Sequence, residues 1–493
     1  MDTAQVPTLP PSAPLLPQEK QGEVLPPGRV AVPPPYYAGY HAIYTDGTMP
    51  APGGFQPRQR RSRTRRFIVR TVHTLILLVL FFMLLPTFLR GLAHVARKID
   101  RWQGNADVAL SGPDLPNDCK SVLAWKALPE HSHELLDAGF DHPHHPHEHY
   151  AARTSVKLPL TSDLLYFIGR GTLSHGLVRI LDDGDSENEV NVTVTFAYGE
   201  ERLLEEAKVC LLEQEGNQHG VGIFTPTWRH RRPHDHHHHT MFLVDIHLPA
   251  KIASDPLHIR AFKTDMPLFR HYIADLVDSV HFDSVSLSTS NVPIHTESLS
   301  ADHAAFRSSN SVISGNFTVW DELQIRTSNS PIIANVTMLN QNDGIATNVT
   351  LTTSNSPLNA NISLVSTSDK ATGGSFNIVT HTSNSPLSVN FTTSPVDSLL
   401  HFSGSTSNSP AHVALDAAYE GSFALHGARF FPPRVEERTG VADPAGKDRT
   451  RTVAVKSIVR GVVDGEVTWD PSENRQFGSV ELRSSNMPIV LVV

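Results

Sequence analysis

The sequence predicts a mainly β protein, in which a β-solenoid of stacked repeats is joined to one transmembrane α-helix and a disordered N-terminal tail. Three observations lead to this prediction. A hexapeptide close to Thr-Ser-Asn-Ser-Pro-Ile recurs through the C-terminal half, an apolar segment occupies residues 67–89, and the first 57 residues are rich in proline.

The recurring hexapeptide has an asparagine near its centre. Successive asparagines are 19, 19, 26, 29, 24 and 78 residues apart. A β-type repeat of this length is typical of stacked coils, in which each repeat packs on its neighbours. We expect equivalent side chains to form a hydrogen-bonded ladder along the stack, with a row of polar ligand contacts as the functional alternative. The seven turn residues are Asn291, Asn310, Asn329, Asn355, Asn384, Asn408 and Asn486.

Each flank of the turn alternates apolar and polar residues, as a strand with one buried face does. Around Asn329, Leu323 and Ile325 precede the turn, and Ile332 and Ala334 follow it. The parity of the alternation changes across the turn, so a straight strand would expose one of the two apolar sets. We therefore expect the chain to bend or bulge at Ser-Asn-Ser-Pro, which keeps both sets buried.

The apolar segment 67–89 is long enough to cross the ~30 Å hydrocarbon core of a membrane as a helix. Residues 71–89 contain no Asp, Glu, Lys or Arg, and seven arginines crowd the N-terminal side between Arg58 and Arg70. Because positive flanks stay in the cytosol, we expect a cytosolic N-terminus and an extracellular or lumenal C-terminal ectodomain, in contact with membrane lipid. This is a single-pass type II arrangement.

Six sequons for N-glycosylation lie C-terminal to this segment, which agrees with the predicted direction. Four of them follow a turn asparagine by six residues, a position that faces outward in the predicted strand register. The sequon residues are Asn191, Asn316, Asn335, Asn348, Asn361 and Asn390.

The proline-rich tail cannot bury enough apolar surface to fold, and we expect it to be disordered. Pro33, Pro34 and Tyr36 fit the PPxY pattern of ligands for WW domains, so a WW-domain protein is a candidate cytosolic partner. The predicted organisation is a tail at 1–66, a helix at 67–89, a His-rich linker at 90–155, a β-rich first part of the ectodomain at 156–280, and the repeats at 281–493 with an inserted loop at about 430–450.

Two histidine clusters lie on predicted loops. Their imidazoles could bind Zn²⁺, Cu²⁺ or Ni²⁺, although a solvated loop without a physiological ligand is the simpler interpretation. Neither cluster has the spacing of a catalytic zinc site, and we expect no cofactor. The candidate ligands are His144, His145, His147, His236, His237 and His238. The chain has two cysteines, Cys119 and Cys210, which could form one disulfide or remain as two free buried thiols.

The Ser-Asn-Ser-Pro turns at 280–493 resemble those of fungal single-pass membrane proteins with an adhesin-like β-repeat ectodomain. They are also similar to bacterial putative-adhesin repeat domains, whose turns read S-N-G-x-I or S-N-S-P-I. The resemblance implies a β-solenoid and suggests adhesion.

Three functions compete. The first is a non-enzymatic surface protein that binds cell-surface or wall glycans, or has a structural role. The second is a polysaccharide-active β-helix enzyme, which would need clustered carboxylates. The acidic residues of the repeats are dispersed and share no offset from the turns, so we expect solvated surface and no enzyme. The third is a trafficking adaptor that uses the PPxY tail. A net charge of −9 gives no support for nucleic-acid binding.

Overall fold

The computed structural model describes residues 115–129, 150–227, 240–250, 255–341, 344–459, 461–470 and 477–493. The chain divides into two compact units, Met1–Asn105 and Ala106–Val493, and every described residue belongs to the second. The predicted tail and the predicted membrane segment 67–89 lie outside the described residues. Within the described ranges, no helix is both long enough and apolar enough to span a membrane.

The described part is mainly β, as the sequence predicts. Its first part comprises β1 (Cys119–Val122), β2 (Lys126–Ala127), β3 (Tyr150–Pro159), β4 (Leu164–Arg170), β5 (Gly176–Gly184), β6 (Glu189–Tyr198), α3 (Glu201–Glu206), β7 (Lys208–Gln214), β8 (Gln218–Phe224) and β9 (Met241–Pro249). Residues 202–213 contain most of α3 and most of β7. Part of the predicted linker 90–155 is also structured, since β1 and β2 lie within it.

The stacked strands that follow are β10 (Leu257–Asp265), β11 (Phe269–Asp275), β12 (Val280–Ser288), β13 (Ile294–Arg307), β14 (Ile313–Arg326), β15 (Ile332–Asn340), β16 (Thr347–Thr352), β17 (Leu358–Ser366), β18 (Ser375–His381), β19 (Leu387–Thr393), β20 (Leu399–Thr406) and β21 (Ala411–Ala414). The chain ends with β22 (Gly421–His426), β23 (Arg434–Glu436), β24 (Thr450–Val459), β25 (Val462–Asp470), β26 (Gly478–Ser484) and β27 (Ile489–Val492).

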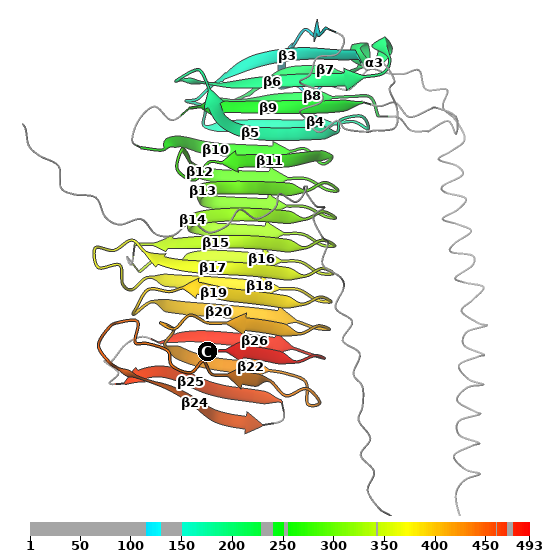
Figure 1. Ribbon diagram of the computed structural model, residues 1–493. Coiled ribbons are helices and arrows are strands. Elements are labelled where there is room, and N and C mark those ends of the chain that lie inside the picture. The colour runs from blue at the N-terminus through cyan, green and yellow to red at the C-terminus, as the bar shows by residue number, and fades with distance from the viewer. Residues whose placement is uncertain are drawn as a thin grey trace, which may run out of the picture. The chain divides into compact units, whose positions relative to one another are not determined.

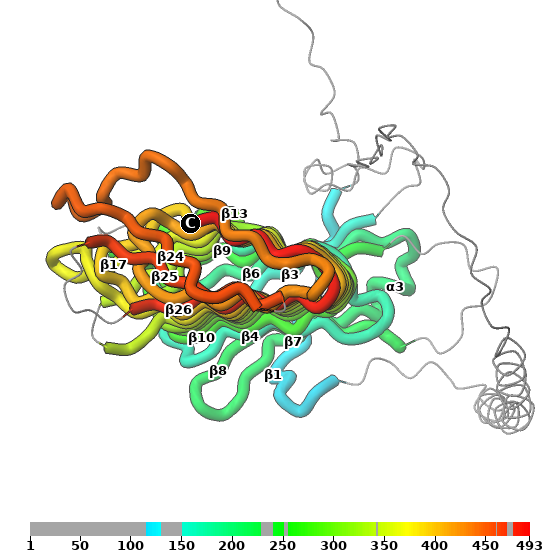
Figure 2. The backbone as a smooth tube through the Cα atoms, turned by 90° about the horizontal axis from the view of Figure 1, so that it is seen from below, coloured from blue at the N-terminus to red at the C-terminus, as the bar shows by residue number. Residues whose placement is uncertain are grey.

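Strands that precede a turn and strands that follow it form two separate parallel ladders. In the first ladder, the strands before the turns pair in the order β10, β12, β13, β14, β16, β18 and β20. In the second, the strands after the turns pair in the order β11, β13, β14, β15, β17, β19 and β21. Strands β13 and β14 are long and contribute one half to each ladder. The strands lie one above another in Figure 1, and their turns superimpose along the stack in Figure 2.

The apolar core lies between the two ladders and is continuous from β3 to β27. Leu323 and Ile325 before the turn are buried, and so are Ile332 and Ala334 after it. Between them, Ser328 and Asn329 are exposed. The chain therefore bends at the turn, and the bend keeps both apolar sets in the core although their parity differs.

The long gap before the last turn has a topological cause. Strand β26 pairs with β20 on one side and with β22 on the other, and β27 likewise lies between β21 and β23. The final residues of the chain are thus inserted into the stack, between strands that come earlier in the sequence (Figure 1).

The segment at about 430–450, predicted as an inserted loop, contains β23 and a buried ion pair. Arg449 Nη2 lies 2.9 Å from Asp443 Oδ1, and the two side chains are 5% and 4% exposed. The guanidinium of Arg449 holds the pKa of Asp443 well below its usual range, because it donates hydrogen bonds to the charged carboxylate. Strand β23 also pairs with β27, and Arg449 Nη1 lies 3.0 Å from Glu420 Oε1, so part of the segment is fixed to the chain beside it.

Candidate binding surface

The turn asparagines form an unbroken ladder of side-chain hydrogen bonds along one edge of the stack. Asn310 donates to Asn291 at 2.8 Å, and Asn329 donates to Asn310 at 2.7 Å. The remaining donors continue in the same sense, from Asn355, Asn384, Asn408 and Asn486, at 2.6–2.8 Å. All seven residues are exposed. Each inner amide uses one N–H and one lone pair in the ladder, so a second N–H and a second lone pair face solvent.

A column of buried hydroxyls supports these turns from below. The residue two positions before each turn asparagine is Thr or Ser, and each of these seven residues is at most 6% exposed. Thr353 Oγ1 donates to the Ser330 carbonyl at 3.1 Å, in the turn of the preceding repeat. Equivalent bonds link the turns of Thr382 and Thr406 to the turns before them. The Thr-Ser-Asn spacing of the repeat contains this column, but the sequence pattern alone does not indicate that its hydroxyls are buried.

The outward-facing sequons form a second asparagine ladder. Asn316, Asn335, Asn361 and Asn390 pair in register on β14, β15, β17 and β19, and all four are exposed. Asn335 donates to Asn316 at 2.8 Å, and Asn361 donates to Asn335 at 2.9 Å. Of the other two sequons, Asn348 is exposed on β16 and Asn191 is half-buried on β6. The four aligned positions can therefore carry glycans without disturbing the core.

An open depression runs along this sequon face. Asn335, Thr337, Asn361, Ser363 and Thr392 line it together with Val336 and Asn390. Six of the seven lining residues carry an amide or a hydroxyl group, and none has an ionisable side chain. Such a surface suits hydrogen bonding to neutral polar ligands.

Three aspartates occupy equivalent positions on successive strands of the first ladder, which we call its rungs. Asp283, Asp302 and Asp321 each precede a turn asparagine by eight residues, so the expectation of dispersed acids is wrong for these three. Each lies near a histidine of the preceding rung. The nitrogen–oxygen distances are 3.8 Å for His258–Asp283, 3.0 Å for His281–Asp302 and 3.6 Å for His303–Asp321.

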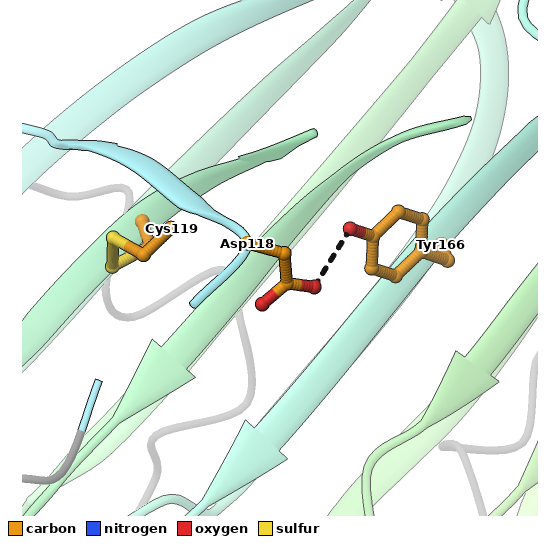
Figure 3. Close-up of a disulfide and its surroundings, with 4 residues drawn as sticks. Asp118, Cys119 and Tyr166 are labelled. Carbon is orange, nitrogen blue, oxygen red and sulfur yellow. Dashed lines mark hydrogen bonds between the residues drawn. A yellow bond between two sulfur atoms is a disulfide. The ribbon is translucent and has the colours of Figure 1, made fainter. Parts of the chain in front are cut away.

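The two cysteines form a disulfide between β1 and β7, with 5.5 Å between the Cα atoms. Next to it, the Tyr166 hydroxyl donates to Asp118 at 3.1 Å (Figure 3). Burial, and then the hydrogen bond to the Asp118 carboxylate, raises the pKa of Tyr166 above its usual range. The disulfide and the hydrogen bond between Tyr166 and Asp118 thus both fix the start of the described chain to the strands beside it.

Two groups of predicted site residues lie outside the described residues. They are the candidate metal ligands His144, His145, His147, His236, His237 and His238, and the WW-ligand residues Pro33, Pro34 and Tyr36. They stay predictions.

No protein-family model matches the chain, and none of the curated proteins matches it either. Among solved structures, a putative cell adhesion protein from Clostridium sporogenes is 8% identical, with 69% of this chain and 99% of that chain covered and a TM-score of 0.15. A putative adhesin from Parabacteroides merdae is 10% identical, with 54% and 92% covered and a TM-score of 0.26. A putative lipid binding protein from Parabacteroides distasonis is 10% identical, with 54% and 90% covered and a TM-score of 0.25.

These similar structures are bacterial, and all three TM-scores are far below 0.5, so no conclusion about function follows from them. The resemblance to fungal membrane proteins stays an expectation.

Proposed function

We propose that this chain is a membrane-anchored, non-enzymatic protein that displays a glycosylated β-solenoid and binds cell-surface or wall glycans through the edge formed by its turns. The single observation that carries the proposal is the unbroken ladder of seven exposed turn asparagines. The apolar segment 67–89 and the arginines before it support the anchor and its direction.

The chemistry of the turn edge suits a hydroxyl-rich polymer. Neighbouring strands in a sheet are about 4.8 Å apart, so the free amide groups repeat at a short, regular interval. Each contact is weak because water competes for it, but many contacts along one polymer chain act together. A long ligand is therefore favoured over a small molecule.

The glycans predicted at Asn316, Asn335, Asn361 and Asn390 would lie on the sheet face beside this edge. None of the seven turn asparagines is part of a sequon. The proposed binding edge therefore stays free of attached sugar, whereas the adjacent face carries it.

The test is co-sedimentation of the intact, detergent-solubilised protein with insoluble cell-wall polysaccharides, with soluble sugar measured in the same tubes. We expect saturable retention without release of sugar. Release that depends on the protein would contradict a non-enzymatic role and favour the polysaccharide-active enzyme. An absence of retention would contradict glycan binding.

A further inference from the structure

The His–Asp pairs on the first rungs of the first ladder suggest a metal site that is separate from the two histidine clusters. His258 on β10 and His281 on β12 are paired in register, and their ring centroids are 5.1 Å apart. Asp283 is two residues after His281 and projects from the same side of β12. One ligand atom from each of these three residues lies within 4.8 Å of the others.

We propose that His258, His281 and Asp283 bind a divalent transition-metal ion, with Asp302 as the fourth ligand. Two imidazoles and two carboxylates form a mixed nitrogen and oxygen donor set, which suits Zn²⁺. Asp302 is not one of the three residues whose ligand atoms lie within 4.8 Å of one another, but we add it because its Oδ1 lies 3.0 Å from Nε2 of His281, on the adjacent strand. Strands β10, β12 and β13 would then be joined through one ion.

Ser300 orients the central ligand. Its Oγ lies 3.0 Å from Nδ1 of His281, and its side chain is buried. A hydrogen bond from Nδ1–H to this hydroxyl leaves Nε2 as the unprotonated atom that can bind a metal. The same Nε2 lies 3.0 Å from Asp302 Oδ1, so a cation bound by both groups would lie between these two atoms.

The other two ligands have the freedom that binding requires. Tetrahedral Zn²⁺ holds its ligand atoms about 3.4 Å apart, since Zn–N and Zn–O bonds are about 2.0–2.2 Å long. His258 and Asp283 are 66% and 51% exposed, so their side chains can rotate toward His281, which is only 12% exposed. Small side-chain rotations close the site while the buried histidine stays in place.

The test uses full-length protein in which the histidines of the two clusters, at 131–149 and 230–239, are replaced by serine in every sample. Zn²⁺ affinity and stoichiometry are measured by competition with a chromophoric chelator, and the melting temperature is measured with and without Zn²⁺. We expect one ion per chain and a higher melting temperature with Zn²⁺, because the ion binds the folded state.

Single variants then locate the ion. His258→Ala and Asp283→Asn remove exposed ligands, and we expect each to weaken Zn²⁺ binding at least about tenfold, as loss of a supporting partner alone typically does. Ser300→Ala should weaken binding by about tenfold through His281. His412→Ala, at an exposed histidine on β21, is the matched control and should leave binding unchanged.

Two results would overturn the proposal. One is the absence of saturable Zn²⁺ binding in the protein that lacks the clusters. The other is binding that His258→Ala and Asp283→Asn leave as tight as before. Both variants lie at exposed positions, so their folding can be verified by the melting temperature without Zn²⁺.

Discussion

Asn329 lies in the middle of the turn ladder, where its amide donates to Asn310 and accepts from Asn355. Asn329→Ala removes both hydrogen bonds at an exposed position, and we expect a loss of about 1 kcal/mol in the free energy of unfolding. Asn291, at the end of the ladder, only accepts one bond from a turn asparagine, so Asn291→Ala should cost about half as much. Urea denaturation of both variants measures the difference. Equal costs at the two positions would contradict a loss of stability that is set by the number of ladder bonds removed.

A buried hydroxyl offers a sharper comparison at the residue scale. Thr353 is fully buried and donates to the Ser330 carbonyl, whereas Thr380 is equally buried and its Oγ1 has no partner among the described residues. We expect Thr353→Val to cost about 1–2 kcal/mol, because the carbonyl loses its donor. Thr380→Val should be neutral or stabilising, because it removes an unpaired buried hydroxyl. Chemical denaturation tests both, and a reversed order would contradict the assigned hydrogen bonds.

His271 makes stability depend on pH. Its ring is fully buried between Thr264 Oγ1 at 2.8 Å and the Phe269 carbonyl at 2.9 Å, and burial lowers its pKa to about 4. The pKa of this histidine in the unfolded chain is about 6.5. At a pH between about 6.5 and about 4, the histidine therefore binds a proton in the unfolded chain but not in the folded chain. The contribution of neutral His271 to the free energy of unfolding is therefore fully present above about pH 6.5 and is lost as the pH falls below it.

We expect His271 alone to remove about 2 kcal/mol of unfolding free energy between pH 6.5 and pH 5. His271→Gln should remove that part of the pH dependence, whatever its effect at neutral pH. The control His412→Gln leaves His271 in place, so its unfolding free energy should keep the same pH dependence as that of the wild type. Urea midpoints of the three proteins from pH 7 to pH 4.5 provide the comparison, and parallel curves for wild type and His271→Gln would contradict the prediction.

At the scale of elements, the disulfide anchors the short edge strand β1, most of whose residues are exposed. Behind it, Trp125 Nε1 donates to the Ala207 carbonyl at 3.1 Å. A disulfide between residues so far apart in sequence typically stabilises the folded state by about 2–4 kcal/mol. We expect the Cys119→Ser/Cys210→Ser variant to release residues 115–129, while the repeats stay folded.

Limited proteolysis with mass spectrometry would detect this release as faster cleavage within 115–129. The repeats 281–493 serve as the internal control, because their cleavage rate should not change. Equal cleavage of 115–129 with and without the disulfide would show that strand pairing alone holds β1 in place.

Sequence alone was sufficient for the strands beside the turns and insufficient for their pairing over long distances. Ile332 and Ala334 alternate with exposed residues, because one face of their strand is buried, and this pattern can be read directly. The insertion of β26 between β20 and β22 depends on contacts across the 78-residue gap, which local patterns do not encode.

The candidate sites also divide into features that the sequence predicts and features that need the strand pairing. The turn ladder follows from the repeat, since equivalent residues stack when repeats do. The offset of Asp283 and Asp302 from the turns was also present in the sequence. Their histidine partners lie 25 and 21 residues earlier, at spacings that the repeat does not fix, so the register between β10, β12 and β13 was needed to find them.

At the scale of the whole molecule, the described chain presents chemically different surfaces. The turn edge carries free amides and hydroxyls, the sequon face carries the predicted glycans, and the first rungs carry the His–Asp pairs. If the turn edge binds glycans, a bulky charge placed on it should block binding without touching the core. Ser309 and Ser328 are exposed in adjacent turns, next to the asparagine ladder.

The most direct measurement is therefore the retention of Ser309→Arg/Ser328→Arg on wall polysaccharides, compared with wild type and with Ile345→Arg. Ile345 is 67% exposed in the loop between β15 and β16, at the ends of the strands away from the turns. We predict that the turn variant loses most of its retention, that Ile345→Arg keeps it, and that no protein releases sugar. Full retention by the turn variant, or release of sugar by wild type, would contradict the account.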